Sequence, residues 1–421
     1  ETSLLTMSAS PGIFLDICRL LCSGPRARMK SRHGAASWSL LLLLATSLAE
    51  PLASPSKQER IEGALWGLFI GDALAAPVHW YYGGPEQIRR DFGSLIEGYR
   101  KAAHPFPESI MQLSNTGGAG RGGSDGDVVG GVILHDKKEY WHRGGQYHYH
   151  HTLRAGENTL EASLVRLLIR SLVRDKQFIG DNFRSDYIRF MTTPGTHNDT
   201  YASTCHRMFF ERWHAGVDPR DCTGNDGHNV DTVDGLILPL VALLHELGRG
   251  RSEEVALATA LEVLSITRKP TELPGFIAAT AGVLGRVLDG MSLPDAAQAE
   301  AYASYGDAND LAREVERRGS RDPVVACYIG GSFPALLHFA FKYGAASPIE
   351  ALLASANAGG ENVHRGAVLG ALVGASGGIH ALPEEFRKGL VHHDQLGSEI
   401  SDFVKNVFLG GNEKESLTAE L

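Results

Sequence analysis

The sequence has few cysteines and no surplus of positive charge, and both shortages limit what the protein can be. Only five cysteines occur among 421 residues, and none of them forms a CxxC pair. Neither a disulfide framework nor a zinc site built from thiolates is therefore expected. The formal net charge is −9 at pH 7, so no general attraction to nucleic acid is expected. An anionic substrate would need local help from metal ions, helix N-termini or backbone amides.

Alternating, strand-like runs are also scarce, and most of the chain has the apolar spacing of helices. This pattern predicts an all-α protein. No long Pro/Ser linker and no repeat interrupts the periodic region, so one domain is predicted over residues 58–410, with a polar tail over 411–421. The predicted helices are Arg60–Ala76, Glu157–Val173, Val233–Leu247, Glu253–Thr267, Gly275–Leu288, Phe333–Tyr343 and Gly366–Ala375.

The first part of the chain, residues 1–57, has the features of a targeting segment and linker. Met29 is followed by basic residues, by an apolar run over Trp38–Ala49 and by small residues just before Glu50. This is the pattern of a secretory signal peptide, and the run is too short for a comfortable membrane span. The predicted location is therefore secreted or the lumen of the endomembrane system. An organellar transit peptide and a cytoplasmic product are the alternatives. No later segment is predicted to span a membrane.

The first predicted helix combines regularly spaced glycines with one acidic residue. Gly63, Gly67 and Gly71 recur every four residues, a spacing that permits close approach of a second helix. Asp72 follows on the same apolar helix. A carboxylate there is costly to bury unless it is hydrogen-bonded or bound to a ligand, so Asp72 is a candidate functional residue.

Three oxygen-bearing side chains, Glu157, Asn158 and Thr159, lie within one turn at the start of the next long helix. Hard divalent cations prefer such ligands. A structural alternative is a capping box, in which Asn158 caps the helix and Glu161 reaches back to it. The residues alone leave both interpretations open.

Histidines and amides gather just before this helix and again before residue 200. His148 and His150 stand in an HxHH run, which is a weak metal signal because neighbouring residues of an extended segment face different ways. His197, Asn198 and Asp199 are predicted to start an amphipathic helix, where they would either cap it or form a polar rim that contacts substrate.

Acidic residues also precede two other predicted helices. Asp231 and Asp234 come before a long apolar helix, whose dipole they would complement. Glu361, Asn362 and His364 follow two glycines and lead into a small-residue helix. Such a helix start is a favourable place for an anion or for a metal held by an acid.

Four segments together resemble the ADP-ribosylglycohydrolase superfamily. They are IEGALWGLFIGDALAAPV (61–78), ENTLEASL (157–164), ITRKPTELPGFIAATAGVL (266–284) and GGENVHRGAVLGALVGA (359–375). The resemblance covers most of residues 58–380, with the motifs in the family's order. It implies a compact, orthogonal, all-α bundle. It also implies a cleft that usually holds two Mg²⁺ or Mn²⁺ ions and cleaves the N- or O-glycosidic bond of ADP-ribose.

The sequence departs from the family pattern at the metal motifs. Glu157-Asn158-Thr159 stands where the family has DDT, and Glu361-Asn362-Val363-His364 stands where it has DxDT. Some relatives carry a glutamate at the position of His79. The number of ligand carboxylates thus falls from four to two, which is too few to bind two Mg²⁺ ions well. An imidazole among the ligands favours a transition metal instead. In these departures the sequence is most similar to the divergent branch that includes the jellyfish lens crystallins.

The resemblance implies roles for fifteen residues of a metal-assisted hydrolase that acts on ADP-ribose, an ADP-ribosylated substrate or a related nucleotide-sugar conjugate. At most one tight divalent cation is expected, Mg²⁺ or Mn²⁺, with His364 shifting the preference toward Mn²⁺ or Zn²⁺. One alternative is a non-catalytic, crystallin-like protein, and another is a hydrolase whose single metal is also bound by His150. The candidate metal contacts are Glu157, Asn158, Thr159, Glu361 and His364; the candidate bases are Asp72, His79 and Asp199; the candidate substrate contacts are Asn115, Gly117, Gly118, His148, His150, His197 and Asn198.

Overall fold

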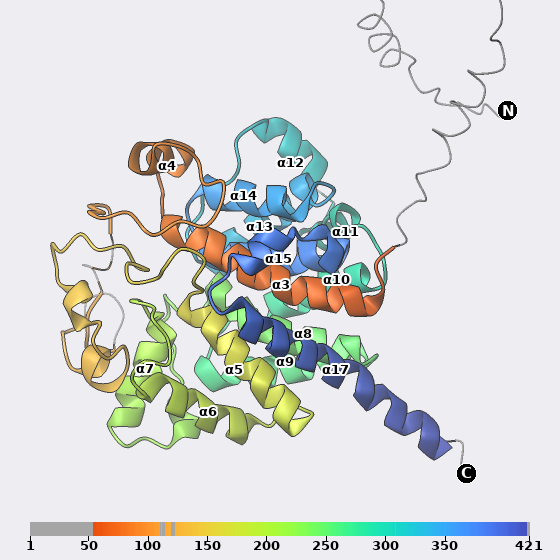
Figure 1. Ribbon diagram of the computed structural model, residues 1–421, viewed down its shortest axis with the longest axis horizontal. Helices are drawn as coiled ribbons and strands as arrows, with labels where there is room; N and C mark the ends of the chain where they lie inside the picture. The colour runs from red at the N-terminus through yellow and green to blue at the C-terminus, as the bar shows by residue number, and fades with distance from the viewer. Residues whose placement is uncertain (1–53, 110, 112–113, 119–122, 308, 419–421) are drawn as a thin grey trace, which may run out of the picture. The chain divides into compact units, whose positions relative to one another are not determined.

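A computed structural model describes residues 54–109, 111, 114–118, 123–307 and 309–418 (Figure 1). The predicted signal between Met29 and Glu50 lies outside these residues. The chain divides into a unit Glu1–Ala53 and a unit Ser54–Leu421, and the second is described here. Within the described residues, the regular structure consists of helices and isolated β-bridges, without strands. The predicted all-α class is therefore confirmed.

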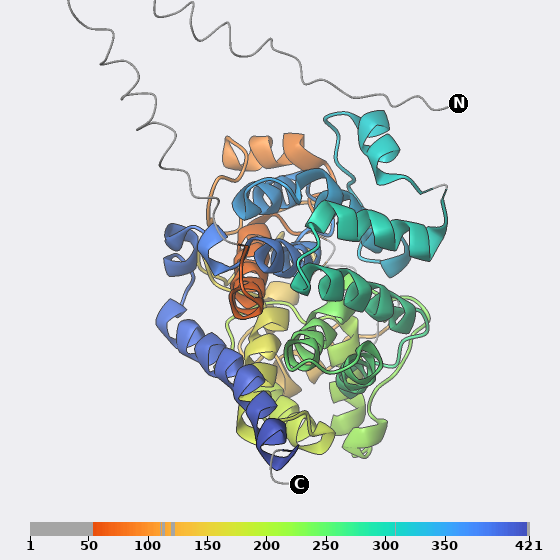
Figure 2. The same ribbon diagram turned by 90° about the vertical axis from the view of Figure 1, so that its right-hand side faces the viewer.

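Two helices, α3 (Lys57–Ala75) and α15 (Val363–Gly377), pack side by side through the core, as Figures 1 and 2 both show. Their glycines meet in antiparallel register: Gly63 lies against Gly374, Gly67 against Gly370, and Gly71 against Gly366. The predicted close approach of a second helix to α3 is confirmed. The helix is also long and apolar enough to cross a membrane, but 94% of that window is buried inside the protein. This identifies α3 as a core helix.

The other helices surround this pair. Helices α8 and α9 pack against each other on one side, and α11 packs on α13 on another. Helix α14 covers both α3 and α15, while α5 packs on α17 and α8. Their bounds are α4 Gly84–Phe92, α5 Leu160–Asp175, α6 Gly180–Thr192, α7 Thr204–His214, α8 Ile237–Gly248, α9 Glu253–Thr267, α10 Leu273–Leu288, α11 Leu293–Tyr305, α12 Leu311–Arg318, α13 Ile329–Tyr343, α14 Pro348–Ala358, α16 Glu384–Lys388 and α17 His393–Thr418.

The seven predicted helices all exist, and their bounds agree within a few residues. One further predicted helix start was wrong, and one of the two open interpretations of Asn158 is not realised. Helix α7 begins at Thr204, so the segment from His197 to Asp199 is a loop rather than a helix start. The capping box of Asn158 and Glu161 is also absent, because Thr159 is the N-cap residue of α5. Asn158 and Glu161 are instead drawn into tertiary contacts.

The two acidic residues before α8 do more than complement the dipole of that helix, because each contacts a specific group elsewhere in the chain. Asp231 accepts hydrogen bonds from the backbone amides of Thr271 and Leu273, at 3.1 and 3.0 Å, and so stabilises the start of α10. Asp234 pairs with Arg268 at 2.8 Å. Carboxylates at a helix start satisfy amides that have no intrahelical partner, and here they join helices that are distant in the sequence.

Candidate functional site

A polar cleft with a volume of about 320 Å³ opens beside the N-terminus of α15. Its walls come from the turn after α3, the start of α7, the 3₁₀ turn η6 (Val233–Leu236), the segment before α13 and the first turn of α15. It is lined by Trp80, Tyr82, Ser114, Tyr201, Ser203, Thr204, Arg207, Asn229, Thr232, Asp234, Ala326, Cys327, Tyr328, Glu361 and His364.

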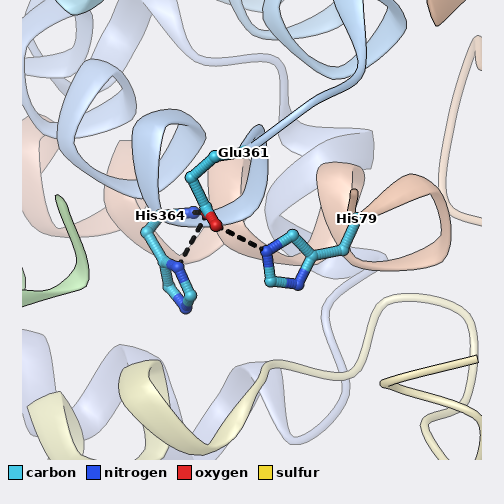
Figure 3. Close-up of side chains that lie close together, drawn as sticks. All are labelled: His79, Glu361 and His364. Atoms are coloured by element: carbon cyan, nitrogen blue, oxygen red, sulfur yellow. Dashed lines mark hydrogen bonds and ion pairs between the residues drawn. The ribbon is translucent and has the colours of Figure 1, made fainter. Parts of the chain in front are cut away.

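Glu361 is the best-connected acid of this cleft. Its side chain is fully buried, and it receives the indole N–H of Trp80 at 2.6 Å. Its two carboxylate oxygens lie 2.9 Å from Nε2 of His79 and 2.8 Å from Nδ1 of His364. Figure 3 shows both imidazoles pointing at this carboxylate. The segment before it turns sharply, since Gly360 has a φ of +64°.

The charges of this group follow from burial and from contact. Burial acts to raise the pKa of Glu361, but the charges of His79 and His364 hold it well below its usual range. Burial acts to lower the pKa of His364, but the nearby Glu361 raises it to about 10. For His79 burial prevails, and its pKa falls to about 4. Contact with the imidazoles thus favours the ionised form of Glu361, and contact with Glu361 favours the protonated form of His364.

Behind His79 the hydrogen bonds continue away from the cleft. Nδ1 of His79 lies 2.8 Å from Nε2 of His150, and Nδ1 of His150 lies 2.8 Å from Asp199. The other oxygen of Asp199 accepts the backbone N–H of Leu160 at 2.8 Å. The structure thus joins three predicted residues, His79, His150 and Asp199, to Glu361 in one buried row.

Asp72 has a different environment. It is completely buried and accepts hydrogen bonds from the side-chain amide of Asn158 at 2.8 Å and from the hydroxyl and backbone N–H of Thr159 at 2.6 and 2.9 Å. Burial raises its pKa, and the bonds from Thr159 and Asn158 partly offset that effect. Asn158 and Thr159, which were predicted to contact a metal, therefore donate hydrogen bonds to Asp72, which was predicted to act as a base.

Four of the predicted residues line a second cavity, which has a volume of about 460 Å³. Its lining includes Glu157, Asn158, His197 and Asn198. Glu157 accepts the backbone N–H of Arg154 at 2.8 Å and the side-chain amide of Asn198 at 3.1 Å. The five predicted metal contacts are thus divided: Glu361 and His364 line the first cleft, Glu157 and Asn158 line the second, and Thr159 bonds to Asp72.

The remaining predicted residues support the walls of the first cleft. Nε2 of His148 lies 3.1 Å from the carbonyl oxygen of His79. The carbonyl of Asn115 accepts a hydrogen bond from Arg207, which lines the cleft. Asn115 also accepts the backbone N–H of Gly117 at 3.1 Å. Gly118 lies against α7, where a side chain would collide with Glu211 and the carbonyl of Arg207.

Several contributors to the site were not predicted. Trp80 directly follows His79 in the sequence, but nothing in the pattern indicated that its indole would bind Glu361. Glu161 pairs with His206 at 2.9 Å, a contact between helices that spacing cannot reveal. Arg268 and Asp234 form a buried ion pair beside the cleft. A signal existed only for Asp234, which stood out as an acid before an apolar helix.

The Asp234–Arg268 pair gives a pH-dependent prediction. Burial acts to raise the pKa of Asp234, but Arg268 and His364 hold it far below 3.8, so its contribution to stability exists above that pH and is lost as the pH falls. Replacing Asp234 with asparagine should destabilise the protein at pH 7 by about 3–5 kcal/mol, because the buried guanidinium loses its partner. Urea unfolding at pH 7 and pH 3.5 should show a smaller difference between variant and wild type at pH 3.5. A difference that grows in acid would contradict the pairing.

Comparison with known proteins places the chain among relatives of the same architecture. The family model described as ADP-ribosylglycohydrolase matches residues 53–415. Among solved structures, 46 chains match. One of them is titled "ADP-ribosylglycohydrolase-related protein complex". It has a TM-score of 0.52 and 19% sequence identity, over 84% of this chain and 99% of that chain. No curated protein matches.

The fold and the cleft define an all-α protein whose polar pocket is built at the start of a buried, glycine-rich helix. The chain belongs to the ADP-ribosylglycohydrolase family, because the family model covers most of its length. The structural match supports the fold. Family membership supports a glycohydrolase-like function.

Proposed function

We propose that the protein is a hydrolase that cleaves a glycosidic bond of ADP-ribose or of a related nucleotide-sugar conjugate in the cleft around Glu361. The observation that carries this proposal is the environment of Glu361, a fully buried carboxylate that is kept ionised by two imidazoles and one indole. A buried acid in a cleft whose pKa is strongly shifted by specific partners is a candidate functional residue. Glu361 also stands in the motif that resembles the family's C-terminal metal motif.

The chemistry of glycosidic cleavage suits this arrangement. The transition state resembles an oxocarbenium ion, and the negative charge of Glu361 would stabilise it from the cleft wall. The cationic His364 and the guanidinium of Arg207 line the same cleft and favour the anionic diphosphate of such a substrate. The aromatic rings of Trp80 and Tyr201 offer apolar faces to a sugar or a base. Metal assistance, which the resemblance implies, stays a prediction.

A second candidate is the non-catalytic, crystallin-like protein. Two observations favour it, both at positions where the family has ligand carboxylates. Val363 is fully buried in an apolar cluster with Ala75 and Ala356, and the Asn158 amide donates to Asp72. Neither residue offers a charged oxygen to a metal. A protein that has lost two ligands in this way can keep the fold and the cleft without the reaction.

Release of ADP-ribose separates the two candidates. The full-length protein would be incubated with serine- and arginine-linked ADP-ribosyl peptides and with O-acyl-ADP-ribose, and free ADP-ribose would be measured by mass spectrometry. Hydrolysis that is faster than in buffer alone would support the proposed hydrolase function. The linkage that is cleaved fastest would identify the substrate class. A folded protein that binds ADP-ribose but releases none from any of these compounds would contradict the proposal and favour the non-catalytic candidate.

A further inference from the structure

A row of contacts joins Asp199 to Glu361 behind the cleft. It has three links: Asp199 to His150, His150 to His79, and His79 to Glu361, at 2.8, 2.8 and 2.9 Å. Both nitrogens of each imidazole face a partner in this row, so the row fixes the orientation of both rings.

Both ends of the row are fixed as acceptors. Asp199 receives the backbone N–H groups of Leu160 and Tyr201, at 2.8 and 3.3 Å, and Glu361 receives the indole of Trp80. All four members of the row are at most 2% exposed. The row therefore holds Nε2 of His79 against Glu361, and Nδ1 of His364 meets the same carboxylate.

We propose that His79, Glu361 and His364 bind a single transition-metal cation of the Zn²⁺ type, through Nε2 of His79, a carboxylate oxygen of Glu361 and Nδ1 of His364. The proposal concerns binding and does not depend on the proposed hydrolase activity. The three ligand atoms lie within 4.8 Å of one another. Within the described part of the chain, His79, Glu361 and His364 form the one group whose geometry suits a metal ion. Figure 3 shows their side chains converging.

Binding requires small geometric adjustments, and Nδ1 of His364 must release its proton to the solvent when the cation binds. Zn²⁺ binds nitrogen and oxygen at about 2.0–2.2 Å, which places tetrahedral ligands about 3.3 Å apart. The present contacts of 2.8 and 2.9 Å would open by roughly half an ångström, which rotation of the side chains can supply. Glu361 and His364 line the cleft, so a fourth coordination position would face it, as in zinc sites that keep an open position.

Asp199 and His150 would then select the correct tautomer of His79. With its Nδ1–H donated to His150, and with the Nδ1–H of His150 donated to Asp199, His79 presents a lone pair at Nε2 toward Glu361. Ligating histidines commonly donate their other N–H to such a partner, which fixes the ring orientation and raises the basicity of the ligand.

The donor set does not fit two Mg²⁺ ions. Mg²⁺ prefers oxygen ligands and binds mainly through carboxylates, whereas this cluster has one carboxylate and two imidazoles. Of the other acids predicted near the metal, Glu157 lines the second cavity and Asp72 is occupied by Asn158 and Thr159. Two imidazoles with one carboxylate are instead a set that suits Zn²⁺ or another transition metal.

Metal analysis of the full-length protein, prepared without a histidine tag, tests the proposal. Samples would be dialysed against Zn²⁺, Mn²⁺ or Mg²⁺ and then against buffer, and their metal content would be measured by plasma emission. We expect one Zn²⁺ per chain, less Mn²⁺ and no retained Mg²⁺. With Co²⁺ as a probe, visible absorption should report a tetrahedral site. A folded protein that retains no Zn²⁺, or one that retains two Mg²⁺, would overturn the proposal.

Substitutions locate the site. His364→Gln and His79→Gln should each weaken Zn²⁺ binding at least 100-fold in calorimetric titration. Asp199→Asn, which leaves all three ligands in place, should weaken it about 10- to 100-fold. The matched control is His245→Gln, another buried histidine paired with a glutamate, which should bind normally. Unchanged binding in both ligand variants would overturn the assignment. If circular dichroism shows that these two are unfolded, Asp199→Asn and its Co²⁺ spectrum decide in their place.

Discussion

Replacing Glu361 with glutamine is expected to lower the rate of ADP-ribose release by about 10²–10⁴-fold, the range for loss of a charged catalytic group. Glutamine keeps the size of the side chain and can still accept the Trp80 indole. It removes the negative charge that would stabilise the transition state and that raises the pKa of His364. Both kcat and kcat/KM should fall, because the lost interaction is made mainly in the transition state. Steady-state kinetics on the best peptide substrate would measure this.

The control for Glu361→Gln is Glu300→Gln. Glu300 is also buried and pairs with Arg286 at 2.8 Å, but it lines a different cavity. Its substitution should leave turnover within about twofold of wild type, while any loss of stability reports the general cost of breaking a buried ion pair. Equal losses of activity in both variants, or full activity in Glu361→Gln, would contradict the role of Glu361.

Much of the fold could be predicted from the sequence because seven of its helices carry their own local signal. The apolar period of Glu253–Thr267 gave the bounds of α9 without error, since both ends have local causes: Ser252 caps the start and a lysine–proline pair follows the end. The start of α7 was placed too early. His197 to Asp199 have the composition of a helix start, but Asp199 is held by His150 and by the amide of Leu160.

The site could be predicted only in part, because its residues meet through tertiary contacts. The resemblance identified Glu361, His364 and His79 separately, and the structure brings them together. It also grouped Glu157 with them, but Arg154 and Asn198 hold that side chain in the second cavity. Local spacing placed Glu157 and Thr159 in one turn, yet it could not show that Thr159 faces Asp72. Which way a polar side chain turns at a helix start depends on partners that lie far away in the sequence.

Replacing Gly67 with leucine is expected to abolish the cooperative fold. A Cβ atom at this position would lie 2.7 Å from the carbonyl carbon of Gly370, and Gly63 and Gly71 meet α15 in the same way. The obstacle is backbone rather than the end of a flexible side chain, so rotamer changes cannot relieve it. Overpacking a core costs about 1–3 kcal/mol where side chains can adjust and more where they cannot. Separating α3 from α15 would open the centre of the core in a protein whose net stability is of order 5–15 kcal/mol.

Gly285→Leu is the matched control, because Gly285 lies inside α10 with open space around the position of a new Cβ. Leucine there should be neutral or stabilising by up to about 1 kcal/mol, since glycine is a poor helix former. Circular dichroism melts of Gly67→Leu, Gly67→Ala and Gly285→Leu would show the order. We expect no transition for Gly67→Leu, a lowered midpoint for Gly67→Ala and an unchanged or raised midpoint for Gly285→Leu. A normal melt for Gly67→Leu would mean that the two helices do not pack through their glycines, and the start of α15, with Glu361 and His364, would then not be fixed against His79 in the way described here.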